Sequence, residues 1–298
     1  MPAKRIDPED GVAYTYDELA AFYKGKYKKK VIDEYWESTC YTSKQAKAKA
    51  KEKASPKGKP KAKEKAKAKA KVKAKAAKPK KEAPPVKLHY FPLKARCFPP
   101  LLALEVGKIN YEAVVVPFDE WPDKKASGIF PMGYLPALEL ADGTMINETG
   151  AMLFTIGKIA RLNGGSTTDF GTSAMLACKA LEVFTEFTKV CPTMFTVKEW
   201  TADKTKAFEE SIPKLTGYLE AFAKLCSDEG KFTKQGNTTG ELALFSLLYH
   251  MKAGAFSGTI PEKLDKFYGR LEALDAVKMC CENKTKMGDL ADYVVKLP

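Results

Sequence analysis

A low-complexity tract of lysine and alanine divides this chain and limits where it can fold. Between Lys44 and Lys81 the sequence holds 18 lysines and two glutamates, and Val72 is the only large apolar residue. Lysines repeated at i,i+4 spacing weaken a helix, and so few apolar side chains cannot form a core. We therefore expect residues 41–86 to form a disordered linker, with a small module before it and a globular region after it.

The same tract explains the charge of the chain. The net charge of +13 is smaller than the charge of the tract alone, so the rest of the sequence is mildly acidic. The basicity therefore does not indicate a nucleic-acid-binding fold. It does suit weak, salt-sensitive binding of a polyanion to residues 44–81, or a nuclear import signal.

Composition also bears on redox compartment, metal binding and location. The seven cysteines are odd in number and none forms a C-x-x-C pair, which indicates free thiols in a reducing compartment. With only two histidines, no metal site is expected. The sequence contains no apolar run long enough to span a membrane and no apolar signal core. We expect a cytoplasmic protein, with the nucleus as the alternative.

Residues 1–40 are predicted to form a small helical module. Thr15 and Glu18 have the spacing of a capping box. Two stripes of apolar residues follow at helical spacing: Leu19, Phe22 and Tyr23, then Val31, Ile32, Tyr35 and Trp36. A module of this size is at the lower limit for independent stability, about 40 residues. It is therefore expected to dock on another surface, or to be an appendage without a function of its own.

Residues 87–165 alternate between strand and helix patterns. Prolines open the first predicted helix, and Asp142-Gly143 is a strong hairpin turn signal. Strands are predicted at 88–91, 111–116, 136–140 and 144–146, and helices at 99–107 and 149–162. This order, βαβ followed by ββα, predicts an α/β thioredoxin-like domain. Residues 117–134 are predicted to be irregular.

Residues 170–298 have helical periodicity throughout. One apolar stripe contains Phe184 and Phe187, and another contains Leu215 and Leu219. A second capping box, Thr238-Thr-Gly-Glu, precedes a strongly apolar helix. The sequence therefore predicts an all-α C-terminal domain.

The motifs in residues 86–298 resemble those of cytosolic glutathione transferases of the tyrosine-dependent kind, the pi, sigma, mu and alpha group. The run Tyr90-Phe-Pro-Leu-Lys-Ala-Arg96-Cys97 is most similar to the start of the pi class. Trp121, Leu135-Pro136, Glu148-Thr149 and the second capping box follow in the family's order. The resemblance implies a detoxification enzyme that uses reduced glutathione as co-substrate, needs no metal and forms a homodimer.

Tyr90 and Arg96 are the catalytic residues that the resemblance implies. The thiol of glutathione is mostly protonated at neutral pH. A hydroxyl group at the end of the first strand can donate a hydrogen bond to the sulfur, which favours the thiolate and lowers the thiol pKa. Arg96 would place a positive charge nearby.

The resemblance also assigns residues that bind the peptide. After a cis Pro136, Leu135 would pair its N–H and C=O with the cysteinyl backbone of glutathione, as an added strand does. Tyr134 precedes this pair. Glu148 and Thr149 open a helix whose N-terminus would bind the γ-glutamyl carboxylate, and Glu148 could also meet its amine.

The glycine end of glutathione would be held by Trp121 and a basic or polar neighbour. Lys124, Lys125 and Ser127 compete for that position, and we favour Lys125. Glu182 would reach the glutathione bound to the partner subunit. A hydrophobic electrophile would pack on the helical side of the site, with Phe91 and Leu93 as candidate walls.

Two other functions fit parts of the sequence. Cys97 stands at a helix N-terminus, where the helix dipole lowers a thiol pKa, so the chain could be a thiol oxidoreductase that forms a mixed disulfide. Glutathione-transferase folds also serve as docking domains in translation and tRNA-charging complexes. The lysine-rich arm and the N-terminal module would suit such a scaffold, and a fold alone does not decide between them.

The lysine-rich tract is expected to be dispensable for catalysis. Deleting residues 1–84 should leave turnover of a general electrophile within about threefold, a change of under ~1 kcal/mol in the activation free energy. Steady-state kinetics of the full and shortened chains would measure this, and a hundredfold loss would show that the N-terminal module completes the site. The same deletion should abolish salt-sensitive retention on a polyanion column.

Overall fold

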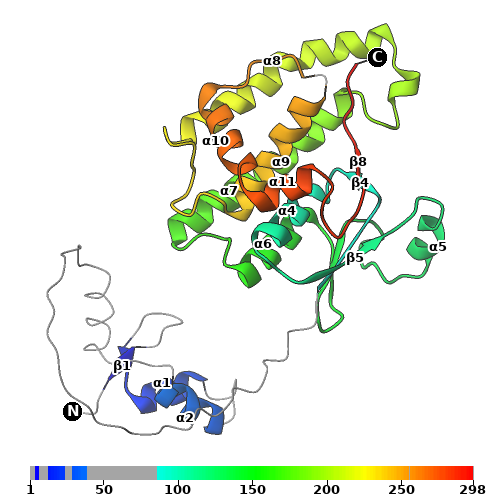
Figure 1. Cartoon of the computed structure of the whole chain (residues 1–298). Coiled ribbons are helices and arrows are strands. Elements are labelled where there is room, and N and C mark those ends of the chain that lie inside the picture. Colours follow the sequence, from blue (N-terminus) through cyan, green and yellow to red (C-terminus); the bar gives the residue numbers. More distant parts are fainter. Residues whose placement is uncertain (1–3, 7–12, 24–28, 39–85, 255, 298) are drawn as a thin grey trace, which may run out of the picture. The chain divides into compact units, whose positions relative to one another are not determined.

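The computed structural model describes residues 4–6, 13–23, 29–38, 86–254 and 256–297. The chain divides into two compact units, Met1–Ala77 and Lys78–Pro298, which are described separately (Figure 1). The predicted linker over 41–86 lies outside the described residues except for Val86, which begins a strand.

The N-terminal unit contains a short antiparallel hairpin and two helices. The bounds are β1 Arg5–Ile6, β2 Ala13–Tyr14, α1 Tyr16–Tyr23 and α2 Lys29–Ser38. Among the described residues of this unit, the buried apolar side chains are Leu19, Tyr23, Ile32 and Trp36. The Thr15 N–H donates to Glu18 Oε2 at 2.8 Å, and the Glu18 N–H donates to Thr15 Oγ1 at 3.3 Å. The capping box therefore starts α1 as the sequence predicts, whereas the hairpin was not predicted.

The second unit begins with a four-stranded sheet in the order β5-β3-β6-β7. The central strand β3 pairs in parallel with β5 and antiparallel with β6. The strands are β3 Val86–Tyr90, β5 Tyr111–Val115, β6 Ala137–Glu139 and β7 Met145–Ile146. The helices α4 Phe98–Val106 and α6 Thr149–Ala160 pack against each other beside this sheet. This is the thioredoxin-like arrangement that the sequence predicts.

Two features of this domain differ from the sequence prediction. The segment predicted to be irregular contains a short helix, α5 Trp121–Ala126, which has Pro122 in its first turn. A two-residue strand, β4 Leu93–Lys94, pairs in parallel with β8 Ala291–Asp292 near the end of the chain. Two-residue strands leave no periodic pattern, so the sequence alone does not reveal this pairing.

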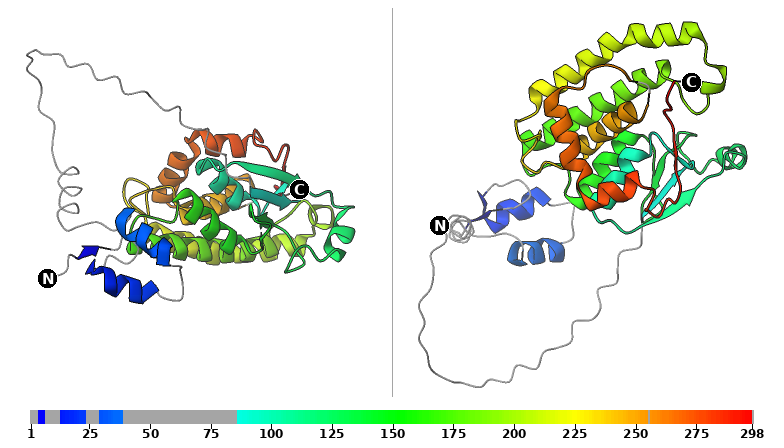
Figure 2. Two further views of the ribbon diagram at one scale, coloured as in Figure 1. Left: turned by 90° about the horizontal axis from the view of Figure 1, so that it is seen from below. Right: turned by 45° about the horizontal axis from the view of Figure 1, so that its top comes forward.

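From α7 to α11 the second unit is mainly helical. Its elements are α7 Thr167–Val190, the 3₁₀ turn η1 Val197–Glu199, α8 Ala202–Leu225, α9 Thr239–Ala253, α10 Glu262–Glu272 and α11 Asp275–Cys281. Helix α9 packs against α4, α6, α7 and α10, and both figures show it enclosed by other helices (Figures 1 and 2). It is apolar on nearly every face because it lies at the centre of the domain. This confirms the predicted helical domain, except that the segment after α11 is extended and contains β8.

Helices α7 and α9 approach closely at Gly240. A Cβ atom at Gly240 would lie 1.9 Å from the Ser173 carbonyl oxygen, so only glycine fits there. The Gly240 N–H donates to Ser173 Oγ at 3.0 Å. This contact brings the first residues of α9 against the first third of α7.

The carboxylate of Glu241, next along α9, is fully buried and accepts several hydrogen bonds. The N–H and the hydroxyl of Thr238 donate to Oε2 at 3.0 and 2.9 Å. The Thr233 hydroxyl donates to the same oxygen at 2.8 Å, and the Phe232 N–H donates to Oε1 at 2.9 Å. The second capping box is therefore present, and Glu241 also anchors the loop that precedes α9.

Glu241→Gln should lower the free energy of unfolding by at least about 2 kcal/mol, because an amide NH₂ would face buried donors and each unpaired donor costs about 1–3 kcal/mol. Denaturant unfolding followed by circular dichroism would measure the change. Glu220 is an exposed carboxylate on α8, and Glu220→Gln is the matched control. The control should change stability by less than about 0.5 kcal/mol. Equal effects of the two substitutions would contradict the role given to Glu241.

Candidate functional site

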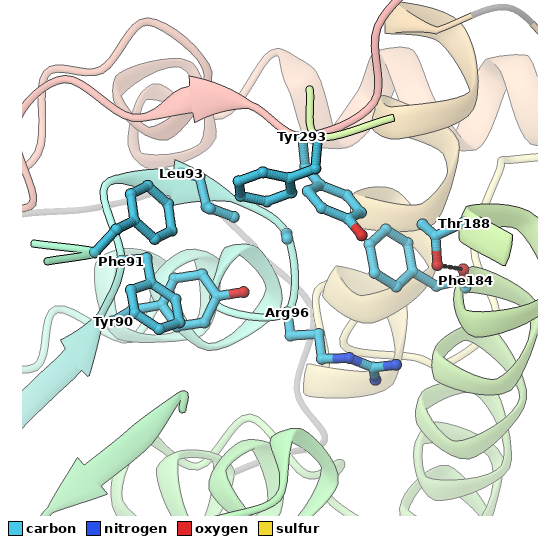
Figure 3. Close-up of a pocket in the computed structure, with 10 residues that line it drawn as sticks. Tyr90, Phe91, Leu93, Arg96, Phe184, Thr188 and Tyr293 are labelled. Carbon is cyan, nitrogen blue, oxygen red and sulfur yellow. Dashed lines mark hydrogen bonds between the residues drawn. The ribbon is translucent and has the colours of Figure 1, made fainter. Parts of the chain in front are cut away.

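A pocket of about 260 Å³ opens between the end of β3 and helix α7 (Figure 3). It lies where the thioredoxin-like domain meets the helical domain. The lining residues are Tyr90, Phe91, Leu93, Ala95, Arg96, Phe118, Phe184, Thr188, Phe195 and Tyr293. Both predicted catalytic residues and both predicted apolar walls are therefore in one pocket.

Tyr90 is the last residue of the central strand β3, and its side chain is 5% exposed. In Figure 3 its hydroxyl points into the pocket. Burial raises the pKa of this hydroxyl, and the neighbouring Cys97 thiol raises it further, while the Arg96 backbone N–H and charge act in the opposite direction. Tyr90 therefore stays protonated through the neutral range and can act as a hydrogen-bond donor.

Arg96 connects the loop after β4 to the helical domain. One guanidinium nitrogen donates to Thr185 Oγ1 on α7 at 3.0 Å, and the guanidinium lies 6.0 Å from the ring centre of Phe184. The Arg96 carbonyl accepts a hydrogen bond from Thr149 Oγ1 at 3.3 Å. These contacts hold the positive charge at the pocket beside Tyr90.

A second wall of the region is the loop before β6. The Leu135-Pro136 peptide bond is cis, as the family resemblance implies. The Asn147 amide donates to the carbonyls of Tyr134 and Pro136 at 2.8 and 3.2 Å and so fixes the two neighbours of Leu135. Within the described part of the chain, the backbone N–H and C=O of Leu135 have no hydrogen-bond partner. They are therefore available to an added peptide strand.

Glu148 and Thr149 lie at the N-terminus of α6. Glu148 has φ 67°, a left-handed conformation that is strained for a residue other than glycine, and its side chain makes no cap hydrogen bond. The Tyr134 hydroxyl donates to the Glu148 carboxylate, which raises the pKa of Tyr134. The first N–H groups of α6 thus lack a side-chain cap, which suits an anion. The Thr149 hydroxyl, in contrast, is already used by the Arg96 carbonyl.

Trp121 and the two neighbouring lysines are on or beside helix α5. The Trp121 ring packs edge-on against Phe91, with ring centres 5.5 Å apart. Lys124 pairs with Glu120 of its own helix at 3.4 Å, whereas the side chain of Lys125 lies near Gly133, in the loop that leads to Leu135. The geometry favours Lys125 over Lys124 as the basic residue of this region.

Glu182 is not brought together with the other predicted site residues. It lies on the exposed side of α7 and pairs with Lys179 at 2.8 Å. Its predicted role depends on a second subunit, so it stays a prediction.

The structure opposes a reactive role for Cys97. Its side chain is fully buried next to α4, and this burial raises the pKa of the thiol far above the neutral range. The expected effect of the helix dipole is therefore outweighed by desolvation. Cys97 does not have the accessible thiolate that mixed-disulfide chemistry needs.

Several pocket residues were not predicted from the sequence. Phe184 belongs to the apolar stripe of a predicted helix, Thr188 lies on the same helix, and Phe118 lies in a loop. Phe195 and Tyr293 come from segments far along the chain. Nothing local distinguishes such residues, because they reach the pocket only when the two domains pack together.

The structure also bears on metal binding and membrane insertion. Among the described residues, no three His, Cys, Asp or Glu side chains gather in a group that could hold a metal ion. No helix in the same part of the chain is long and apolar enough to cross a membrane.

The sequence matches no protein-family model, and it matches no curated protein. Solved structures do match its fold. Prostaglandin synthase D of Nilaparvata lugens has a TM-score of 0.53 and 20% identity, over 68% of this chain and 99% of that one. A nematode-specific glutathione S-transferase of C. elegans has a TM-score of 0.56 and 20% identity, over 67% and 97%.

A monomeric glutathione S-transferase from the hookworm Necator americanus also matches, with a TM-score of 0.56 and 20% identity over 67% of this chain and 98% of that chain. At these identities the likeness shows the fold alone. The chain has the glutathione S-transferase fold, and its predicted fold class, a thioredoxin-like domain followed by a helical domain, is confirmed.

Proposed function

We propose that this protein is a tyrosine-type glutathione transferase that activates the thiol of reduced glutathione for attack on hydrophobic electrophiles. The observation that carries the proposal is the Tyr90 hydroxyl, a protonated donor that points into a pocket between the two domains, with Arg96 beside it. The glutathione S-transferase fold and the cis Pro136 loop support it.

In the proposed mechanism, Tyr90 donates a hydrogen bond to the glutathione sulfur and stabilises the thiolate. Lowering the thiol pKa by about two units requires roughly 2.7 kcal/mol of preferential thiolate stabilisation. One hydrogen bond to a charged group contributes about 1.5–3 kcal/mol. Arg96 adds a favourable charge, so the two residues together are sufficient.

The peptide portion of glutathione would lie along the loop before β6. Leu135 would pair its free backbone groups with the cysteinyl residue, and the start of α6 at Glu148 and Thr149 would bind the γ-glutamyl end. Trp121 and Lys125 would hold the glycine carboxylate. This assignment uses the open Leu135 backbone groups and the uncapped α6 N-terminus.

The electrophile would occupy the aromatic part of the pocket. The rings of Phe91 and Phe118 stack at 4.9 Å, and Phe118 contacts Phe195 at 5.6 Å. Phe118 and Phe195 are 43% and 57% exposed, so they offer apolar surface to a ligand. The thiolate would form a new carbon–sulfur bond, and the electron pair would leave with the leaving group or move to an acceptor atom of the electrophile.

Tyr90→Phe should lower the rate at neutral pH by roughly tenfold to a hundredfold, because one charge-assisted hydrogen bond worth about 1.5–3 kcal/mol is lost. Glutathione affinity, measured by calorimetry, should change little. The apparent thiol pKa of bound glutathione, read from thiolate absorbance against pH, should rise, since the thiolate loses a donor.

Cys97→Ser is the control for Tyr90→Phe and should be nearly silent in the same assays. If Tyr90→Phe leaves the rate unchanged and Cys97→Ser abolishes activity, the protein is a thiol oxidoreductase and not a transferase. If the parent chain does not bind glutathione, the proposal fails and a docking or scaffold role takes its place.

Lys125→Met should raise the KM for glutathione by about threefold to fivefold, the effect of losing a solvent-exposed ion pair worth up to about 1 kcal/mol. Lys124→Met is the matched control and should leave this KM within about twofold, because Lys124 already pairs with Glu120. Steady-state kinetics at low salt would measure both. A larger effect of the Lys124 substitution would reverse the assignment.

We also propose a homodimer in which Glu182 reaches the partner's glutathione. On α7, Met175, Cys178 and Glu182 form an exposed stripe that could face a second subunit.

The proposed location is the cytoplasm, with the nucleus as the alternative. The six cysteines of the described residues are free thiols, which suits a reducing compartment. Weak polyanion binding through residues 44–81 stays a prediction, because that tract lies outside the described residues.

A further inference from the structure

The last described segment, residues 284–297, runs back across the first domain of its unit, and we refer to it as the C-terminal strap (Figures 1 and 2). Near its start, Lys286 Nζ donates to Asn110 Oδ1 and to the Tyr111 carbonyl, both at 3.0 Å. Further along, the Ala291 N–H donates to the Pro92 carbonyl at 3.1 Å, and β8 then pairs with β4.

Beyond β8 the strap crosses to the helical domain. The Met194 N–H donates to the Tyr293 carbonyl at 2.9 Å, and the Val295 N–H donates to the Pro192 carbonyl at 3.1 Å. The strap therefore bridges the two domains at the edge of the pocket.

The two faces of the strap have different partners. Successive side chains of a strand point to opposite sides. Tyr293 lines the pocket, and Figure 3 shows its hydroxyl directed into the same space as that of Tyr90. The preceding residue, Asp292, instead contacts Lys94 and Tyr249, away from the pocket. The same alternation holds on β4, where Leu93 and Ala95 line the pocket and Lys94 between them does not.

Lys94 is the central group of this contact. Its side chain is 4% exposed, and its ammonium group donates to Tyr249 Oη at 3.1 Å and to the Cys281 carbonyl at 3.0 Å. Asp292 Oδ1 lies 3.5 Å from the same nitrogen and accepts from Tyr249 Oη at 3.1 Å. Asp292 supplies the carboxylate that balances this buried charge.

We propose that Lys94, Tyr249 and Asp292 are positioning residues that fasten the C-terminal strap, so that Tyr293 becomes a fixed wall of the electrophile pocket and determines its specificity. The inference rests on the proposed function, because it assigns control of the electrophile side of that same site. The Asp292 side chain is half-exposed. The hydrogen bonds that hold the loop around Leu135 and Glu148 do not involve the strap. Loosening the strap should therefore leave the glutathione side of the site in place.

Asp292→Ala in the full chain tests the fastening directly. The carboxylate leaves, so the backbone amides of residues 291–295 should exchange with deuterium about tenfold faster, the result of about 1.4 kcal/mol less local stability. Asp289→Ala is the matched control, since Asp289 is an exposed aspartate of the same strap without an ion pair among the described residues. It should leave exchange unchanged.

The pocket is probed with 8-anilinonaphthalene-1-sulfonate, an apolar dye, and with 1-chloro-2,4-dinitrobenzene as the electrophile. For Asp292→Ala the Kd of the dye and the KM of the electrophile should each rise by about fivefold, while the KM of glutathione stays within about twofold. Tyr293→Ala should reproduce both pocket effects, because it removes the wall itself.

Unchanged exchange at 291–295 in Asp292→Ala would overturn the fastening, and so would equal effects of the two aspartate substitutions. Lys94→Met provides a second test of the same contact, with the same expected exchange. A rise in the KM of glutathione equal to that of the electrophile would mean a general loss of structure and would also overturn the proposal. Deuterium exchange does not depend on turnover. If the parent chain fails to bind glutathione, the proposed function is refuted, and the exchange measurements still test the contact between Asp292 and Lys94.

Discussion

The buried ammonium group of Lys94 is the interaction on which the shape of the site depends. Three oxygen atoms surround it, and they come from three elements of the helical region: Tyr249 on α9, Cys281 at the end of α11 and Asp292 on β8. An ammonium group has three protons to donate, so each partner can be matched. The carbonyl of Lys94 also lies 3.0 Å from Nε2 of His250. Both ends of this residue therefore tie the loop after Tyr90 to the second domain.

Arg96 lies on this loop and Tyr90 at the strand end just before it, and both domains supply the surfaces around them. Tyr90 takes its position from the central strand, which is paired on both sides. Arg96 reaches across to Thr185, so the charge beside Tyr90 is held by α7 rather than by its own domain. The pocket is consequently a property of the interface between the two domains, because its aromatic wall combines Phe91 and Phe118 of the first domain with Phe195 and Tyr293 of the second.

The sequence and the structure agree best where the signal is local. The capping boxes at Thr15 and Thr238 form because their partners lie three residues away. The Asp142-Gly143 turn has Gly143 at φ 86°, and the Thr144 N–H donates to the Asp142 carboxylate at 2.9 Å. The alternative role for Cys97 is not favoured for the opposite reason, because the burial that raises its pKa depends on the packing of the folded domain.

The sequence by itself determined the order of elements and the thioredoxin-like and helical domains, whereas the candidate residues led by Tyr90 and Leu135 follow from its resemblance to a known family. Hydrophobic periodicity, turn residues and short motifs encode these features within a few positions of the chain. Only the tertiary structure decided that Tyr293 lines the pocket, that Lys125 rather than Lys124 lies near the Leu135 loop, and that β8 pairs with β4. Such contacts join residues separated by up to about two hundred positions, and they form only when the packing of both domains brings those residues together.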